Sequence, residues 1–134
     1  MDEELERLKE QKMKELAKGA GVPSSGDWPS TPVVLTDATF DSFAANHTLT
    51  VVDFWATWCG PCRLVAPVVE AMAKEYVGKV AFGKLDVDEN QATAMRFNTM
   101  SIPTLLILKN GKEIDRIIGA YPREYIEGKI RSHM

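Results

Sequence analysis

Both cysteines of the chain lie within one five-residue stretch, Trp58-Cys59-Gly60-Pro61-Cys62. An apolar run over residues 51–56 precedes the stretch, and a helical pattern of apolar residues follows it. A strand that ends in a tight turn and opens a helix would place Cys59 at the helix N-terminus, where unpaired backbone N–H groups and the macrodipole favour a negative charge. Cys62 returns to the same face one turn later, within reach of a disulfide bond. The pair is a candidate dithiol that opens and closes, with Cys59 as the exposed thiolate and Cys62 turned inward.

The alternatives to redox chemistry are a metal site and a purely structural disulfide. A zinc site needs two further ligands, but the chain has no third cysteine, and His47 and His133 stand far apart in the sequence. An iron–sulfur cluster needs more than two thiolates. A disulfide that closes so short a loop adds little stability through chain entropy. Redox exchange is the leading interpretation, and we expect neither a metal nor a bound cofactor.

The order of motifs along the chain resembles that of the thioredoxin family, and the resemblance covers residues 33–134. The motifs are Val52-Asp53-Phe54-Trp55-Ala56, Trp58-Cys59-Gly60-Pro61-Cys62, Ala66-Pro67, Lys84-Leu85-Asp86-Val87-Asp88, Ile102-Pro103-Thr104, Lys109-Asn110-Gly111 and Gly119. The resemblance implies a thioredoxin fold, an α/β architecture with a central mixed β-sheet flanked by helices. It also implies a general protein disulfide reductase that works by dithiol–disulfide exchange.

The exchange implied by this resemblance uses both cysteines in turn. The Cys59 thiolate attacks a substrate disulfide, and Cys62 resolves the mixed disulfide, so that the substrate leaves reduced and the protein is left oxidised. The implied partners are disulfide-containing protein substrates and a thioredoxin reductase that recharges the pair. Two other classes remain open: an adaptor that uses the same surface without redox turnover, and a disulfide oxidant or isomerase.

Asp53 interrupts an apolar strand that is expected to be covered on both faces, so its carboxyl group should be buried with a raised pKa. The resemblance implies that this carboxyl accepts the proton of Cys62 during resolution, either directly or through water. The alternative is a structural ion pair with Lys84 on the neighbouring strand, and the two interpretations are compatible.

Further residues are assigned to the site by the resemblance alone. It implies that the Ile102–Pro103 bond is cis and that the backbone of Ile102 pairs with an extended substrate segment. Trp55 is expected in the core. The flat surface around the sulfur atoms is assigned to Trp58, Gly60, Pro61 and Gly119.

The first 32 residues lie outside the resemblance. Residues 1–18 are predicted to form a charged amphipathic helix, whose apolar stripe should dock on the chain's own domain, a second copy or a separate partner. Residues 19–32 are predicted to be a linker, because nine of the fourteen are Gly, Pro or Ser. Trp28 within it is expected to pack against the domain surface, with ligand stacking as the alternative. The thioredoxin domain is assigned to residues 33–134.

Apolar periodicity and turn residues predict alternating strands and helices within this domain. The predicted strands cover residues 33–35, 49–56, 80–87, 104–108 and 113–118. The first predicted helix is capped by Thr36 or Asp37, the next two cover residues 60–76 and 90–97, and the last begins at Pro122. Asn110-Gly111 predicts a two-residue hairpin turn between the last two strands. The helix that begins at Gly60 is expected to bury Leu64, Val65, Val68, Val69 and Met72.

Composition limits the partners and the compartment that we expect. The 134 residues are 45% hydrophobic and 26% charged, which is typical of a globular protein. A net charge of -3, with basic and acidic residues interspersed, gives no field that attracts nucleic acid or an anionic membrane. The acidic N-terminus does not resemble a signal peptide, and no apolar stretch approaches the length of a membrane span. We therefore expect a cytoplasmic protein, in a compartment whose reducing conditions suit a cycling dithiol.

Overall fold

A five-stranded mixed sheet organises residues 28–134, the part of the chain that this computed structural model describes. Its strands are β1 (Val33–Leu35), β2 (Leu49–Trp55), β3 (Ala81–Asp86), β4 (Thr104–Lys109) and β5 (Lys112–Ile118). They lie in the order β1-β3-β2-β4-β5, where β3 pairs in parallel with β1 and β2, and β4 pairs antiparallel with β2 and β5. This is the mixed sheet expected of a thioredoxin fold.

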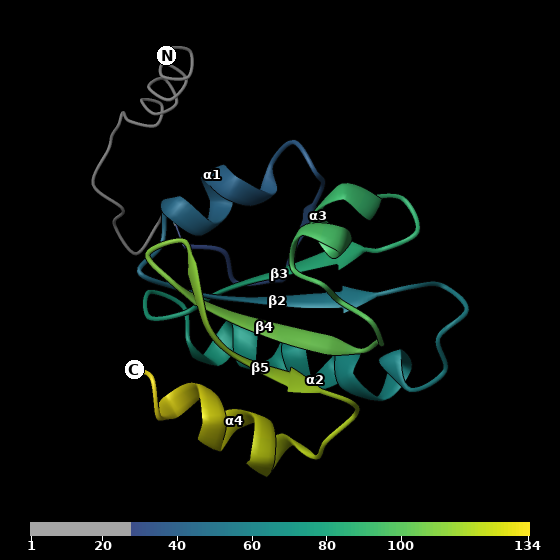
Figure 1. The fold of residues 1–134 in the computed structure, drawn as a ribbon. Helices are drawn as coiled ribbons and strands as arrows, with labels where there is room; N and C mark the ends of the chain where they lie inside the picture. Colours follow the sequence, from purple (N-terminus) through teal and green to yellow (C-terminus); the bar gives the residue numbers. More distant parts are fainter. Residues whose placement is uncertain (1–27) are drawn as a thin grey trace.

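Four helices cover the two faces of the sheet (Figure 1): α1 (Phe40–Ala45), α2 (Cys62–Glu75), α3 (Gln91–Arg96) and α4 (Arg123–Arg131). Helices α1 and α3 lie on one face, and α2 and α4 lie on the other. Because side chains alternate along a strand, Val51 of β2 belongs to the core beneath α2 and α4, whereas Val52 and Phe54 belong to the core beneath α1 and α3. Asp53 therefore points to the α2 face, toward the helix that begins with Cys62.

The hairpin between β4 and β5 turns through Asn110 and Gly111, as predicted. Both residues have positive φ, 51° and 86°, which is the backbone conformation of a type I′ turn. Each strand extends one residue further toward the turn than predicted. The prediction of β1 matches the observed strand, and the bounds of β2, β3 and α3 lie within one residue of those predicted at each end.

Helix α2 differs from its prediction in two respects. It begins at Cys62 rather than at Gly60, so Cys59 precedes the regular helix. Leu64 was expected in the core but is 70% exposed. Its neighbour Val65 begins the buried stripe that continues through Val69 and Met72, and Leu64 lies about 100° away from Val65 around the helix axis.

The predicted cap of helix α1 was also wrong. Thr39 occupies the N-cap position, and Asp37 reaches a different helix. One carboxylate oxygen of Asp37 accepts hydrogen bonds from the backbone N–H of Thr93, at 2.8 Å, and from its hydroxyl, at 2.6 Å. These bonds hold the pKa of Asp37 below its usual value and tie the start of α1 to helix α3.

The predicted helix over residues 1–18 lies outside the described residues, as does most of the predicted linker. Residues 28–32 of that linker contain no helix or strand, in line with the prediction. Trp28 packs against the domain as expected, with its ring centroid 4.8 Å from that of His47 in an edge-on arrangement. No helix within residues 28–134 is long and apolar enough to cross a bilayer.

Candidate active site

The two cysteines lie where β2 gives way to α2. After β2 ends at Trp55, the chain turns so that the N–H of Cys59 donates a hydrogen bond to the carbonyl oxygen of Ala56 at 3.2 Å. Cys59 and Cys62 form a disulfide, with their Cα atoms 5.4 Å apart. The backbone N–H of Cys62 points at Cys59 Sγ, 3.2 Å away. A helix N-terminus commonly offers a backbone N–H to a side-chain acceptor three residues earlier, and here the acceptor is the sulfur of Cys59.

Burial does not distinguish the two cysteines. Each residue is 4% exposed, so the expectation of an exposed Cys59 and an inward Cys62 was wrong for the disulfide form. Both pack with Ala56, and Trp55, Val87 and Ile102 cover the group. The asymmetry of the pair comes from the backbone instead, because only Cys59 Sγ accepts a hydrogen bond from the first turn of α2.

Asp53 is buried beneath this disulfide, as predicted. The residue is 4% exposed, and its Oδ1 atom has no hydrogen-bond partner. Burial raises the pKa of Asp53 to about 7, and the positive charge of Lys84 offsets part of that rise. Asp53 and Lys84 are register partners across β2 and β3, but the ammonium group of Lys84 lies 5.7 Å from the centroid of the Trp55 ring. Lys84 therefore lowers the pKa of Asp53 through the electric field of its charge rather than through direct contact.

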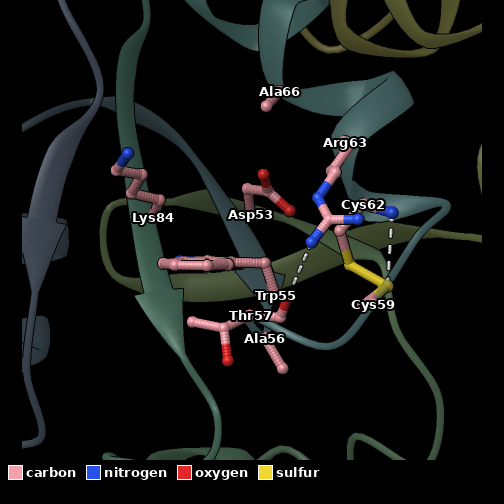
Figure 2. A pocket seen from close by; sticks show the side chains of 9 residues that line it. All are labelled: Asp53, Trp55, Ala56, Thr57, Cys59, Cys62, Arg63, Ala66 and Lys84. Atoms are coloured by element: carbon pink, nitrogen blue, oxygen red, sulfur yellow. Dashed lines mark hydrogen bonds between the residues drawn. A yellow bond between two sulfur atoms is a disulfide. The ribbon is translucent and has the colours of Figure 1, made fainter.

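A cavity of about 140 Å³ joins the carboxyl group to the sulfur atoms. Figure 2 shows the side chains of Asp53, Arg63 and both cysteines turned toward this space. Trp55, expected in the core, is half-buried and forms one wall of the cavity. The cavity is large enough to hold water, which needs about 10–15 Å³ per molecule by this measure. No group of three or more His, Cys, Asp or Glu side chains in residues 28–134 is arranged to hold a metal ion.

The residues assigned to the surrounding surface lie close to the disulfide. Trp58 is 68% exposed, and its Nε1–H donates a hydrogen bond to Asp88 Oδ2 at 2.7 Å. Gly60 and Pro61 are exposed between the cysteines. The Ile102–Pro103 bond is cis, as the resemblance implied, and Ile102 packs against the cysteine cluster. Gly119 donates its backbone N–H to the carbonyl oxygen of Pro103 at 2.9 Å, which places it beside this loop.

Comparison with known proteins identifies this arrangement. Residues 31–132 match the family model for thioredoxin. The chain belongs to the thioredoxin family. It is 47% identical over 102 residues to a thioredoxin of Staphylococcus aureus, an alignment that covers 76% of this chain and 97% of the relative.

Solved structures of thioredoxins agree with this fold. A mutant thioredoxin from Halobacterium salinarum NRC-1 superposes with a TM-score of 0.73 at 31% identity, over 78% of this chain and 92% of that chain. Plasmodium falciparum thioredoxin gives a TM-score of 0.71 at 37% identity, over 76% of this chain and 99% of that chain. Together with the Cys59–Cys62 disulfide, these matches make the chain a thioredoxin-family dithiol–disulfide oxidoreductase.

Two residues of this thioredoxin site were missed by sequence reasoning. Arg63 lines the cavity, and its Nη2 donates a hydrogen bond to the carbonyl oxygen of Thr57 at 3.2 Å, across the turn that carries Cys59. Asp88 accepts the hydrogen bond from the indole N–H of Trp58. Arg63 could have been noticed because it directly follows Cys62. The contact between Asp88 and Trp58 spans thirty residues, and no local pattern indicates it.

Proposed function

We propose that the chain acts as a general protein disulfide reductase in which Cys59 attacks and Cys62 resolves. The observation that carries the assignment of roles is the hydrogen bond from the Cys62 N–H to Cys59 Sγ. A donor at the start of a helix stabilises negative charge on the atom that it faces, so the Cys59 thiolate is the form that this turn favours. Cys62 has no equivalent donor among the hydrogen bonds of the turn.

The proposed exchange proceeds in two balanced steps. The Cys59 thiolate attacks one sulfur of the substrate disulfide, which forms a mixed disulfide and releases the other substrate sulfur as a thiolate. Cys62 then loses its proton and attacks Cys59 Sγ, which releases the second substrate sulfur. Two electrons pass to the substrate, and the Cys59–Cys62 disulfide remains. A thioredoxin reductase returns the pair to the dithiol, and this transfer makes the chain an electron carrier.

We assign the removal of the Cys62 proton to Asp53. A carboxyl group with a pKa of about 7 is present in both protonation states near neutral pH, as an efficient proton acceptor requires. The cavity shared by Asp53 and Cys62 supports a transfer through water. Lys84 tunes this acceptor by lowering its pKa, so we assign it a positioning role beside Asp53.

The substrate is proposed to lie across the surface around the disulfide, which Trp58, Gly60, Pro61, Ile102, Pro103 and Gly119 form. The exposure of Trp58 and the packing of Ile102 against the cysteine cluster support this assignment. An extended substrate segment could pair with the backbone of Ile102, as in a short β-augmentation. We place the reaction in the reducing cytoplasm, where a dithiol of this kind is recharged rather than kept oxidised.

Reduction of insulin disulfides by the full chain tests the proposal. The wild type should reduce insulin with dithiothreitol as the electron source, and the Cys59→Ser/Cys62→Ser double variant should show no more than the background rate. The reduction potential of the pair should be strongly reducing against glutathione, whereas an oxidising value would indicate an oxidant or isomerase. If the double variant still performs the chain's role in the cell in full, that role does not require redox turnover. The chain is then an adaptor, and the proposal fails.

We also propose that the domain needs none of residues 1–27. The family match begins at residue 31, and Trp28 is held on the domain by His47. Deleting residues 1–27 should leave insulin reduction within about twofold of the full chain. Deleting residues 1–30 also removes the aromatic contact, which should cost about 1 kcal/mol more, a typical value for such a pair. Urea unfolding of both truncated proteins measures this difference in stability. If the protein that lacks residues 1–27 does not fold, the proposed domain boundary is wrong.

A further inference from the structure

Met100 is the most exposed large hydrophobic side chain in residues 28–134. It is 86% exposed, and Met95 of helix α3 is 77% exposed. Met134 is 51% exposed, and Met72 is fully buried. Peroxides convert the thioether of an accessible methionine to the sulfoxide, which methionine sulfoxide reductases convert back. Met100 and Met95 are therefore the methionines in this part of the chain that a peroxide reaches most easily.

Met100 differs from Met95 in its distance from the disulfide along the surface. It lies two residues before Ile102 and lines a hollow together with Trp58, Val87, Thr99, Ser101 and Ile102. Val87 and Ile102 also pack against the cysteine cluster, so this hollow is continuous with the reacting sulfur atoms. Met95 lines only a second hollow, nearer helix α3. An oxygen atom added to Met100 would lie next to the disulfide, whereas one added to Met95 would not.

The hollow beside Met100 also contains a hydroxyl group that makes no hydrogen bond. Thr99 Oγ1 is buried and has no hydrogen-bond partner in the described part of the chain. A buried hydroxyl without a partner costs free energy, and a thioether sulfur accepts hydrogen bonds only weakly. A sulfoxide, in contrast, is polar and carries an oxygen atom that accepts a hydrogen bond. Because the methionine side chain is flexible, it can bring that oxygen to a group in the same hollow.

We propose that Met100 is a site of reversible oxidation, that its sulfoxide accepts a hydrogen bond from the hydroxyl of Thr99, and that this change slows the reduction of protein disulfides. In the oxidation step the O–O bond of hydrogen peroxide breaks and an S–O bond forms. The sulfur atom loses two electrons to the peroxide, and water leaves. The inference rests on the proposed function, because it concerns the rate of disulfide reduction.

The expected effect depends on the size of the substrate. A protein substrate carries a chain segment on each side of its disulfide, and that segment must lie on the surface next to Cys59 during attack. A polar sulfoxide held in the hollow replaces apolar surface there, and contact with the segment then removes water from a polar group at a cost in free energy. A small disulfide has no such segment, so its reduction should not respond to the oxidation of Met100.

The experiment treats the full chain with hydrogen peroxide in its disulfide form, in which neither cysteine is a thiol. Mass spectrometry of peptides should show that Met100 and Met95 oxidise before Met134, and Met72 last. Catalase then removes the peroxide, and the rates of reduction of insulin and of hydroxyethyl disulfide are each divided by the rate of the same protein before treatment. The insulin rate of the wild type should fall by about threefold, as expected for an apolar contact that becomes polar. The rate with hydroxyethyl disulfide should not change.

Three leucine variants identify the methionine that is responsible. Met100→Leu cannot be oxidised at this position, so it should keep its insulin rate through the treatment. Met95→Leu is the matched control, because Met95 is also highly exposed but lies outside the hollow next to the disulfide. It should lose as much activity as the wild type, and so should Met134→Leu. Thr99→Val replaces the hydroxyl by a methyl group of similar size, and it should lose less than the wild type.

Reversal completes the test. The two methionine sulfoxide reductases, one for each epimer of the sulfoxide, should restore the insulin rate of the oxidised wild type. The inference is overturned if Met100→Leu or Thr99→Val loses as much activity as the wild type, if the loss is not reversed, or if hydroxyethyl disulfide shows the same loss. An untreated wild type that reduces neither probe would overturn the proposed function and the inference with it. An untreated wild type that reduces both probes, and whose rates peroxide does not change, would overturn the inference alone.

Discussion

Cys62→Ser should remain covalently joined to its substrate, whereas Cys59→Ser should lose disulfide reduction altogether. The Cys62→Ser variant keeps the thiolate that attacks, because serine retains the backbone N–H that faces Cys59 Sγ. Without a second thiol, the mixed disulfide is not resolved. Cys59→Ser removes the sulfur that this N–H stabilises, so reduction of insulin should fall by at least a hundredfold, to the background rate.

Mass spectrometry under non-reducing conditions measures the trapped species. Cys62→Ser incubated with insulin should gain the mass of one insulin molecule, whose two chains remain joined by a second disulfide, and dithiothreitol should release it. The control is Cys59→Ser, which should gain no such mass. Alkylation of the reduced wild type at pH 7 provides an independent check of the roles. Faster labelling of Cys62 than of Cys59 would contradict the assignment.

Asp53→Asn should raise the free energy of unfolding by about 2 kcal/mol above pH 7. Burial raises the pKa of Asp53 from 3.8 to about 7, and a difference of about three pKa units corresponds to about 4 kcal/mol at 1.36 kcal/mol each. The amide carries no charge, but burying it without a full set of hydrogen bonds costs about 1–3 kcal/mol. The net gain is the difference between these two effects.

This stabilisation should depend on pH in one direction. Between pH 3.8 and about 7 the folded protein binds a proton at Asp53 that the unfolded chain releases, so the stability of the wild type falls as the pH rises through this window. Asp53→Asn should therefore be more stable than the wild type above pH 7 and less stable than the wild type near pH 4, where Asp53 is uncharged and only the cost of burying the amide remains. Urea unfolding of both proteins at several pH values measures the profile. An advantage that stays constant with pH would mean that the effect comes from packing rather than from charge.

The same variant should slow resolution of the mixed disulfide, because the amide does not accept the proton of Cys62. Lys84→Met provides the matched comparison. It removes the charge that lowers the pKa of Asp53, so the pH range over which stability falls should extend upward. If Asp53→Asn turns over normally and melts lower than the wild type, Asp53 has a structural role only.

The sequence alone determined the features that depend on local pattern. Cys59 and Cys62 lie three residues apart, and this spacing brings them together in any helical turn. The central strand β2 could be predicted because its run of apolar residues fits a strand buried on both faces. Asn110-Gly111 predicted the hairpin because the turn needs two residues with positive φ, which Asn and Gly tolerate. The single carboxylate in β2 made the burial of Asp53 predictable as well.

The tertiary structure decided which side chains share a space. Trp55 is a large apolar residue of the kind found in cores. It nevertheless forms a wall of the cavity, because it is the last residue of β2 and lies where the strand gives way to the turn before α2. Asp37 accepts a hydrogen bond from Thr93 of α3 instead of capping α1. Leu64 faces solvent because the elements that pack against α2 determine which of its side chains are buried. The equal burial of the two cysteines arises in the same way. Periodicity fixes the direction of a side chain relative to its own element, but contacts between distant elements depend on how those elements pack.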